Sequence, residues 1–168
     1  MPTGLKQSSS VVAIGFSADE SAANTFSQST VDLNLSPLDR EVFVVLAINM
    51  DPFTPDMAAT DSKVESSLTT TSQTQVVNLS NANCLAASSN FIKTDNAGHA
   101  VSFQSMAGET PPATLEYIGI IATNDFFIQV GGTGNAGAKG VDGKLYGYRA
   151  TASADIFAAL VQSEVLSA

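Results

Sequence analysis

The chain has 168 residues, 44% hydrophobic and only 14% charged, and its 16 acidic against 7 basic residues give a net charge of −9. The hydrophobic content excludes a disordered chain. The acidic balance argues against a folded surface that grips nucleic acid, because phosphate binding requires clustered Lys and Arg. The single cysteine, Cys84, excludes an intramolecular disulfide framework.

The low charge also bears on the surface of the folded chain. Charged residues make up 14% of the sequence, against roughly 25% in an average soluble domain. Ser, Thr, Asn, Gln, Ala and Gly must therefore cover much of the surface. Such a surface favours close packing against other subunits, and it is equally compatible with an ordinary β protein of the secreted type.

The domain organisation predicted from the sequence is an N-terminal arm, residues 1–10, followed by a single β-sandwich domain, residues 11–168. The arm is polar, with Pro2, Gly4 and three consecutive serines, and Lys6 is its one basic residue. The apolar run that follows, Val11–Phe16, is shorter than the apolar region of a secretory signal. No apolar run approaches the ~20 residues of a membrane-spanning helix, so no transmembrane segment is expected.

The first half of the chain reads as a series of short strands. Val31–Leu35 alternates apolar and polar residues, which is the period of a strand with one wet face. Glu41–Met50 is almost entirely apolar and β-branched, so it predicts a central strand that is buried on both faces. Two prolines then exclude strand pairing at residues 52–55. Further strands are predicted at Val64–Thr70 and Thr74–Leu79.

The second half adds one short helix, more strands and a terminal helix. Asn81–Asn90 is predicted to form a short helix capped by Asn81, and Val101–Ser105 alternates as a strand. A three-stranded antiparallel meander is predicted from Leu115–Ile121, Phe126–Val130 and Lys144–Thr151.

The chain ends in a segment, Ala154–Leu166, with an apolar stripe at helical spacing. Ser153 is a candidate cap, and a terminal strand is the alternative. Taken together, the elements predict an all-β fold. It is an antiparallel, jelly-roll-like β-sandwich of about eight strands with a short C-terminal helix.

The sequence shows no constellation that predicts catalysis. Gly132–Gly137 fits the spacing of a dinucleotide-binding loop, but two more glycines follow within six residues and exclude the helix that such a site requires. The loop is therefore interpreted as a flexible, exposed hairpin. The only histidine, His99, lies in a turn, and a pairing with Cys84 has no supporting context.

Metal binding has one weak candidate. Asp51, Asp56, Asp61 and Glu65 recur every four or five positions and could meet around a calcium ion, but they do not follow the spacing of an EF-hand loop. The interpretation preferred here is a solvated acidic loop. We accordingly predict no catalytic residues, no metal ligands, no cofactor-binding residues and no cofactor, and hence no enzyme.

The predicted strands resemble those of single jelly-roll virus capsid proteins in number. The strand blocks behind this resemblance are Val31–Leu35, Glu41–Met50, Val64–Thr70, Thr74–Leu79, Val101–Ser105, Leu115–Ile121, Phe126–Val130 and Lys144–Thr151. The resemblance is architectural and rests on no specific motif. One departure is that many capsid arms are rich in Arg and Lys, whereas residues 1–10 contain only Lys6.

The resemblance implies a self-assembling structural protein, a viral capsid (coat) protein located in the virion. Its partner would be itself, as a homo-oligomer that can close into an icosahedral shell, together with other virion proteins. Deletion of residues 1–10 is then expected to weaken assembly and leave the fold intact. The alternative is a non-catalytic binding module, of the carbohydrate-binding or adhesin type, that uses the loops at Gly131–Gly143 and Asp51–Asp61.

Overall fold

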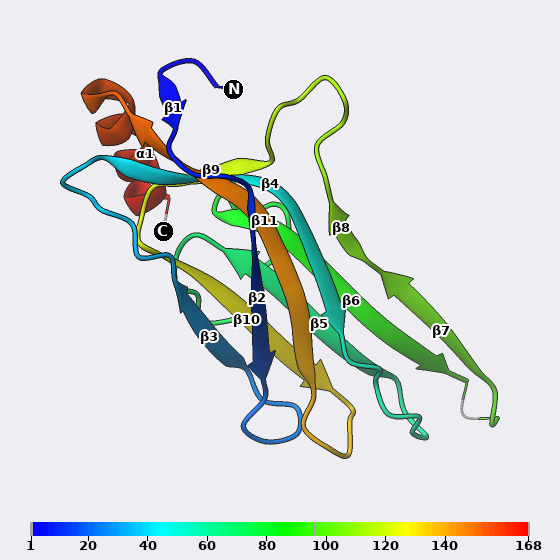
Figure 1. Cartoon of the computed structure of the whole chain (residues 1–168). Helices are drawn as coiled ribbons and strands as arrows, with labels where there is room; N and C mark the ends of the chain where they lie inside the picture. Colours follow the sequence, from blue (N-terminus) through cyan, green and yellow to red (C-terminus); the bar gives the residue numbers. More distant parts are fainter. Residues whose placement is uncertain (1, 96, 168) are drawn as a thin grey trace.

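The computed structural model describes residues 2–95 and 97–167, which form two antiparallel sheets and one helix (Figure 1). Met1 of the predicted arm and the terminal Ala168 lie outside the described residues. The elements are β1 (Leu5–Gln7), β2 (Val12–Asp19), β3 (Ser27–Asp32), β4 (Glu41–Pro52), β5 (Ser62–Thr69), β6 (Cys84–Thr94), β7 (Ala100–Ser105), β8 (Ala107–Glu109), β9 (Gly119–Ile121), β10 (Asp125–Thr133), β11 (Gly140–Ala152) and α1 (Ala154–Leu166).

The strand order identifies the architecture. In the first sheet, called the β4 sheet, β11 and β4 are central, β1 and β2 pair with β11, and β8 and β9 pair with β4. The second sheet, called the β5 sheet, has the order β3-β10-β5-β6-β7. The order β2-β11-β4-β8 facing β3-β10-β5-β6 is that of a jelly roll with two Greek keys. The predicted fold class is confirmed, and β1, β7 and β9 extend this eight-stranded frame.

The main core lies between the two sheets. Its side chains come from alternate positions of the long strands, as expected for two inner faces that interdigitate. Phe16 of β2 and Phe126 of β10 meet there edge to face, with ring centroids 5.9 Å apart. This contact connects the β4 sheet directly to the β5 sheet.

The central strand β4 is buried on both faces in its first half, as the sequence predicts. Phe43 and Val45 point into the main core, and Val42 and Val44 point to the opposite face, all at most 1% exposed. Further along, the pairing register between β4 and β11 shifts by one residue, between Tyr146 and Gly147 of β11. Such a bulge changes which side chains face inward.

The C-terminal helix α1 covers the outer face of the β4 sheet (Figure 1). Ile156, Phe157 and neighbouring side chains of α1 pack on a second apolar cluster that includes Leu5 of β1. The predicted helix is thus confirmed and covers its own sheet. Ser153 occupies the N-cap position, but its side chain makes no capping hydrogen bond.

Strand β1 bears on the truncation expected from the sequence. Leu5, Lys6 and Gln7 pair with β11, and Leu5 is only 6% exposed. Deletion of residues 1–10 would therefore remove a buried side chain and a strand from the β4 sheet. We expect such a truncation to lower stability as well, so substitutions of exposed side chains test assembly more cleanly. The role of residues 1–10 as an arm stays a prediction.

Four local predictions are wrong. Strand pairing was excluded at residues 52–55, but Pro52 ends β4 and pairs with Val141 of β11. The strands that were expected to form a meander do not pair with one another, because β9 and β11 belong to the β4 sheet and β10 to the β5 sheet. Residues 84–94 form strand β6 where a helix was expected, and residues 74–79 form a loop where a strand was expected. At residues 84–94 long-range pairing overrides the local helix signal, since β6 lies between β5 and β7.

Candidate assembly surfaces

A polar cluster joins three loops at one end of the sandwich, between β2 and β3, β4 and β5, and β10 and β11. Asn135, 6% exposed, is at its centre. Its Oδ1 accepts the Asp56 N–H at 2.9 Å, and its Nδ2 donates to the Lys63 carbonyl at 2.9 Å. The Asn24 side chain exchanges two further bonds with the Asn135 backbone. The two loops proposed as binding loops do lie together, but their polar groups bind each other.

Two carboxylates hold the loop between β10 and β11. Glu20, 5% exposed, accepts the N–H groups of Gly132 and Lys139 at 2.6 and 2.8 Å. Asp56 binds the Lys139 Nζ at 2.6 Å and accepts two more backbone N–H groups of the same loop. The interpretation of this glycine-rich stretch as a flexible hairpin is therefore wrong. It crosses from one sheet to the other, and strand β11 follows it.

Replacement of Asn135 by Ala is expected to lower the free energy of unfolding by about 1–3 kcal/mol, because the Asp56 N–H and the Lys63 carbonyl lose their partner. Urea unfolding followed by circular dichroism measures this loss. Asn78→Ala is the matched control, since the Asn78 side chain is exposed and bonds only within its own turn. Equal effects of the two substitutions would contradict a central role for Asn135.

The Asp56–Lys139 contact predicts a dependence of stability on pH. The hydrogen bond from Lys139 and those from the loop backbone lower the pKa of Asp56 below the ordinary value of an aspartate. A lowered folded pKa means that this contribution is present above the unfolded pKa and is lost as the pH falls through the folded one. Melting curves from pH 6 to 2 should show a smaller acid-induced loss in Asp56→Asn than in the wild type. Asp51→Asn serves as control, since Asp51 is exposed near the end of β4, the strand that precedes the loop of Asp56.

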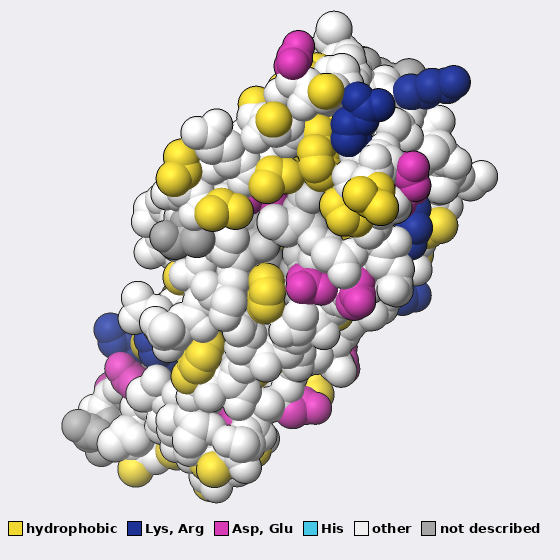
Figure 2. Space-filling model, turned by 90° about the vertical axis from the view of Figure 1, so that its left-hand side faces the viewer, with side chains coloured by type: hydrophobic (Ala, Val, Ile, Leu, Met, Phe, Trp, Pro, Cys, Tyr) yellow, Lys and Arg dark blue, Asp and Glu magenta, His cyan; other side chains and the backbone are white. Residues whose placement is uncertain are grey.

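An apolar surface surrounds the turn before β4, and we call it the Leu38 surface. Leu38 is 95% exposed at the tip of this turn. Beside it is a groove of about 290 Å³, with Leu35 and Pro37 on one side and Phe157 and Val161 of α1 on the other. Figure 2 shows hydrophobic side chains gathered over the upper half of this side of the molecule, among few charged groups. A burial partner for Leu38 would have to come from another molecule.

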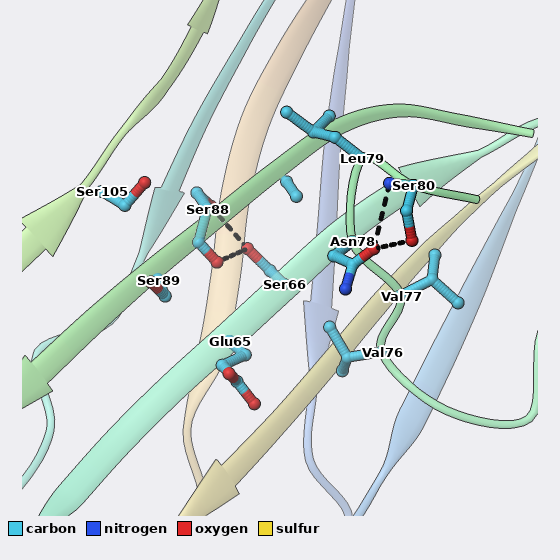
Figure 3. Close-up of a pocket in the computed structure, with 11 residues that line it drawn as sticks. Glu65, Ser66, Val76, Val77, Asn78, Leu79, Ser80, Ser88, Ser89 and Ser105 are labelled. Carbon is cyan, nitrogen blue, oxygen red and sulfur yellow. Dashed lines mark hydrogen bonds between the residues drawn. The ribbon is translucent and has the colours of Figure 1, made fainter. Parts of the chain in front are cut away.

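A groove of about 470 Å³ lies against the β5 sheet, and we call it the serine groove. Glu65, Ser89 and Ser105 lie side by side across β5, β6 and β7, and the loop Val76–Ser80 forms the wall (Figure 3). The groove combines hydroxyl groups, one carboxylate and an apolar wall. This arrangement suits a polar ligand or an extended segment of another chain.

An apolar row crosses the β5 sheet next to the serine groove. Phe91 of β6 is directly opposite Phe103 of β7, and Val101 is opposite Lys93 one row further along. Phe103 and Val101 are each 57% exposed. Alternation of apolar and polar residues usually marks a strand with its apolar face in a core. In β7 that face points to solvent, which the sequence alone does not reveal.

The residues considered for catalysis are not brought together. His99 Nδ1 lies 2.7 Å from Asp95 Oδ2 in the turn between β6 and β7, where both side chains are exposed. Cys84 begins β6, whose opposite end is next to this turn. Ten residues of extended strand span about 33 Å. A thiol–imidazole pair of Cys84 and His99 is therefore excluded in this fold.

The four acidic residues considered for calcium also have separate environments. Asp56 binds Lys139, Asp61 Oδ1 accepts the Thr94 N–H at 2.9 Å, and Glu65 pairs with Lys63. Within residues 2–95 and 97–167, no group of three or more His, Cys, Asp or Glu side chains is placed to hold a metal ion. The structure therefore does not gather these acids into a calcium site.

Two further observations concern charge and hydropathy. The basic side chains of Lys63, Lys139 and Arg149 lie within 4 Å of a carboxylate. Among the described parts of the chain, no helix is both long and apolar enough to cross a membrane.

Comparison with known proteins identifies no family. No protein-family model matches the chain, and no curated protein matches it. Among solved structures, the chain is similar to one of Desmodium yellow mottle tymovirus, with 10% identity and a TM-score of 0.30 over 92% of this chain and 95% of that one. The assignment as a jelly roll rests on the strand order described above.

Proposed function

We propose that this protein is a self-assembling structural protein, a viral capsid (coat) protein whose copies build the shell of a virion. The observation that carries the proposal is the exposure of large apolar side chains on ordered positions of a jelly roll. Leu38 is 95% exposed and Phe103 57% exposed. Jelly rolls of this kind occur in viral capsids, as well as in lectin domains and cupins.

The Leu38 surface has the properties of a subunit contact. Its turn is held by hydrogen bonds from Asp39, Arg40 and Glu41 back to Ser36 and Pro37, so Leu38 is presented without a further loss of backbone freedom. The groove lies directly beside the protruding side chain. Repeated contacts of this kind can close a symmetric assembly.

The alternative function is a non-catalytic binding module. The serine groove favours it, because hydroxyl and carboxylate groups at Ser89, Ser105 and Glu65 adjoin the apolar side chains of Phe91 and Phe103. Sugars combine hydroxyl groups with apolar ring faces and would suit such a surface. A glycan array with the wild type and Ser89→Tyr tests this: binding that Ser89→Tyr abolishes would favour the module.

The proposed function is tested by the variant Leu38→Asp. A carboxylate at this tip adds charge to the apolar contact, so we expect the oligomer to dissociate while the circular dichroism spectrum stays unchanged. Met57→Asp is the matched control, since Met57 is 78% exposed in the loop between β4 and β5. Light scattering after size exclusion gives the mass. If Leu38→Asp and the wild type have the same oligomeric mass, the Leu38 surface is not a contact.

A further inference from the structure

The edge of the β5 sheet at β7 has no neighbouring strand. β7 pairs with β6 on one side, and no described strand pairs with its other side. All six of its residues are exposed, and none is charged or proline. Natural proteins usually protect such an edge with Lys, Pro, a bulge or a very short strand. β7 has none of these protections.

The apolar face of β7 also points outward. Val101 and Phe103 lie on the surface of the sheet, where Phe91 is the neighbour of Phe103. An unpaired backbone edge and an unburied apolar row therefore coincide on one strand. Another strand added beside β7 would pair this backbone edge and give Val101 and Phe103 apolar neighbours on that side.

We propose that β7 pairs antiparallel with β7 of a second copy, across a two-fold axis at Ser102. In this register Ser102 lies opposite Ser102 of the other copy. Val101 of each copy lies opposite Phe103 of the other copy. Each row then joins an aromatic to a β-branched side chain, a favourable cross-strand pair. The inference deepens the proposed function and rests on it, because it names one contact of the assembly.

Charge does not oppose a second copy at this edge, in spite of the net charge of −9. The strands that meet are uncharged. The row of paired residues that contains Phe103 would run across both copies. It has Lys63 at one end and Lys93 of the second copy at the other, and these are the nearest like charges within that row. Four strand spacings separate them, about 19 Å, which exceeds the Debye length of about 8 Å at physiological salt. Lys63 is in addition paired with Glu65 at 2.8 Å.

The two-fold arrangement also limits growth. Each copy offers one β7 edge, and the pairing consumes it, so the contact closes as a dimer. The Leu38 surface remains available for contacts of a different symmetry. The dimer would thus be a building block of a larger assembly.

Cross-linking tests the pairing directly. Ser102→Cys is placed in a Cys84→Ser background and treated with a short bis-maleimide at concentrations at which the protein assembles. We expect rapid formation of a covalent dimer. Thr30→Cys is the matched control, because Thr30 is exposed on β3, the opposite edge of the same sheet. Cross-linking of Ser102→Cys no faster than that of Thr30→Cys would overturn the pairing.

A second variant separates this inference from the proposed function. Phe103→Lys places a charge in both rows of the contact and should raise the dimer dissociation constant at least about tenfold. Leu115→Lys should leave it unchanged, since Leu115 is 59% exposed in the loop between β8 and β9. If the wild type assembles and neither Phe103→Lys nor cross-linking differs from its control, the pairing is refuted and the proposed function stands. A wild type that is monomeric at every concentration, without cross-linking, refutes both.

Discussion

Replacement of Phe126 by Ala is expected to lower the free energy of unfolding by about 3–5 kcal/mol. Phe126 is 0% exposed and lies in the main core, where its ring meets Phe16 of the opposite sheet edge to face. The substitution removes the transfer free energy of the ring and leaves a cavity between two sheets whose strands cannot collapse easily. At about 2–4 °C per kcal/mol for a chain of this size, the melting temperature should fall by roughly 6–20 °C.

Differential scanning calorimetry on the wild type and Phe126→Ala measures this loss. Phe26→Ala is the matched control, because Phe26 precedes β3 and is 40% exposed. Phe16→Ala and the double variant complete a cycle that isolates the aromatic contact. A loss in Phe126→Ala no larger than that in Phe26→Ala would mean that the two sheets do not pack as described.

Replacement of Glu164 by Ala is expected to lower the free energy of unfolding by about 2 kcal/mol. Glu164 is the one buried residue of α1, at 7% exposed, and its two carboxylate oxygens accept the N–H groups of Ala122 and Thr123 at 2.8 and 2.9 Å. Without them, two backbone donors lose their partner, at about 1–3 kcal/mol for each buried one. Removal of a buried charge offsets part of this loss.

The readouts for Glu164→Ala are urea unfolding and hydrogen exchange of the Ala122 and Thr123 amides, which should become much faster. Ser163→Ala is the control, since Ser163 is exposed on the same helix. Unchanged exchange at both amides would show that Glu164 does not hold the turn between β9 and β10.

Glu164 also predicts a pH dependence opposite to that of Asp56. Burial raises the pKa of Glu164 above the ordinary value of a glutamate, although the hydrogen bonds from Ala122 and Thr123 act to lower it. A raised folded pKa means that the folded chain binds the proton more tightly. The contribution of Glu164 is therefore largest below the unfolded pKa and falls as the pH rises through the folded one. In Glu164→Gln, the free energy of unfolding should therefore depend less on pH between pH 4 and 7 than in the wild type. The same slope in both proteins would contradict this role of Glu164.

The elements whose apolar pattern continues over many consecutive residues could be predicted from the sequence. The continuous apolar run of β4 indicates a strand buried on both faces, and the helical stripe of α1 indicates a helix that covers a surface. Both are confirmed. The jelly-roll-like class also follows from the number and spacing of short strands, without any specific motif.

Strand pairing could not be predicted in the same way. β9, β10 and β11 follow one another in sequence, and a local reading pairs them as a meander, but in a Greek key successive strands often belong to opposite sheets. The β6 segment contains Ala86, Ala87 and Asn90, which favour a helix or a turn locally. Its place between β5 and β7 decides its conformation.

The candidate surfaces were even less accessible to sequence reasoning. The alternation of Val101 and Phe103 predicts a strand, yet no local signal says that their side faces solvent. The polar cluster around Asn135 joins residues more than 70 positions apart, such as Asp56 and Asn135. Such contacts depend on the fold as a whole.

The most direct test of self-assembly is the mass of the purified protein in solution, measured by light scattering after size exclusion over a range of concentration and salt. Negative-stain imaging of the same fractions gives their shape. The proposed function predicts discrete oligomers or closed shells of uniform size, with a dimer as the smallest associated species. A monomer of 17.3 kDa under every condition would contradict it.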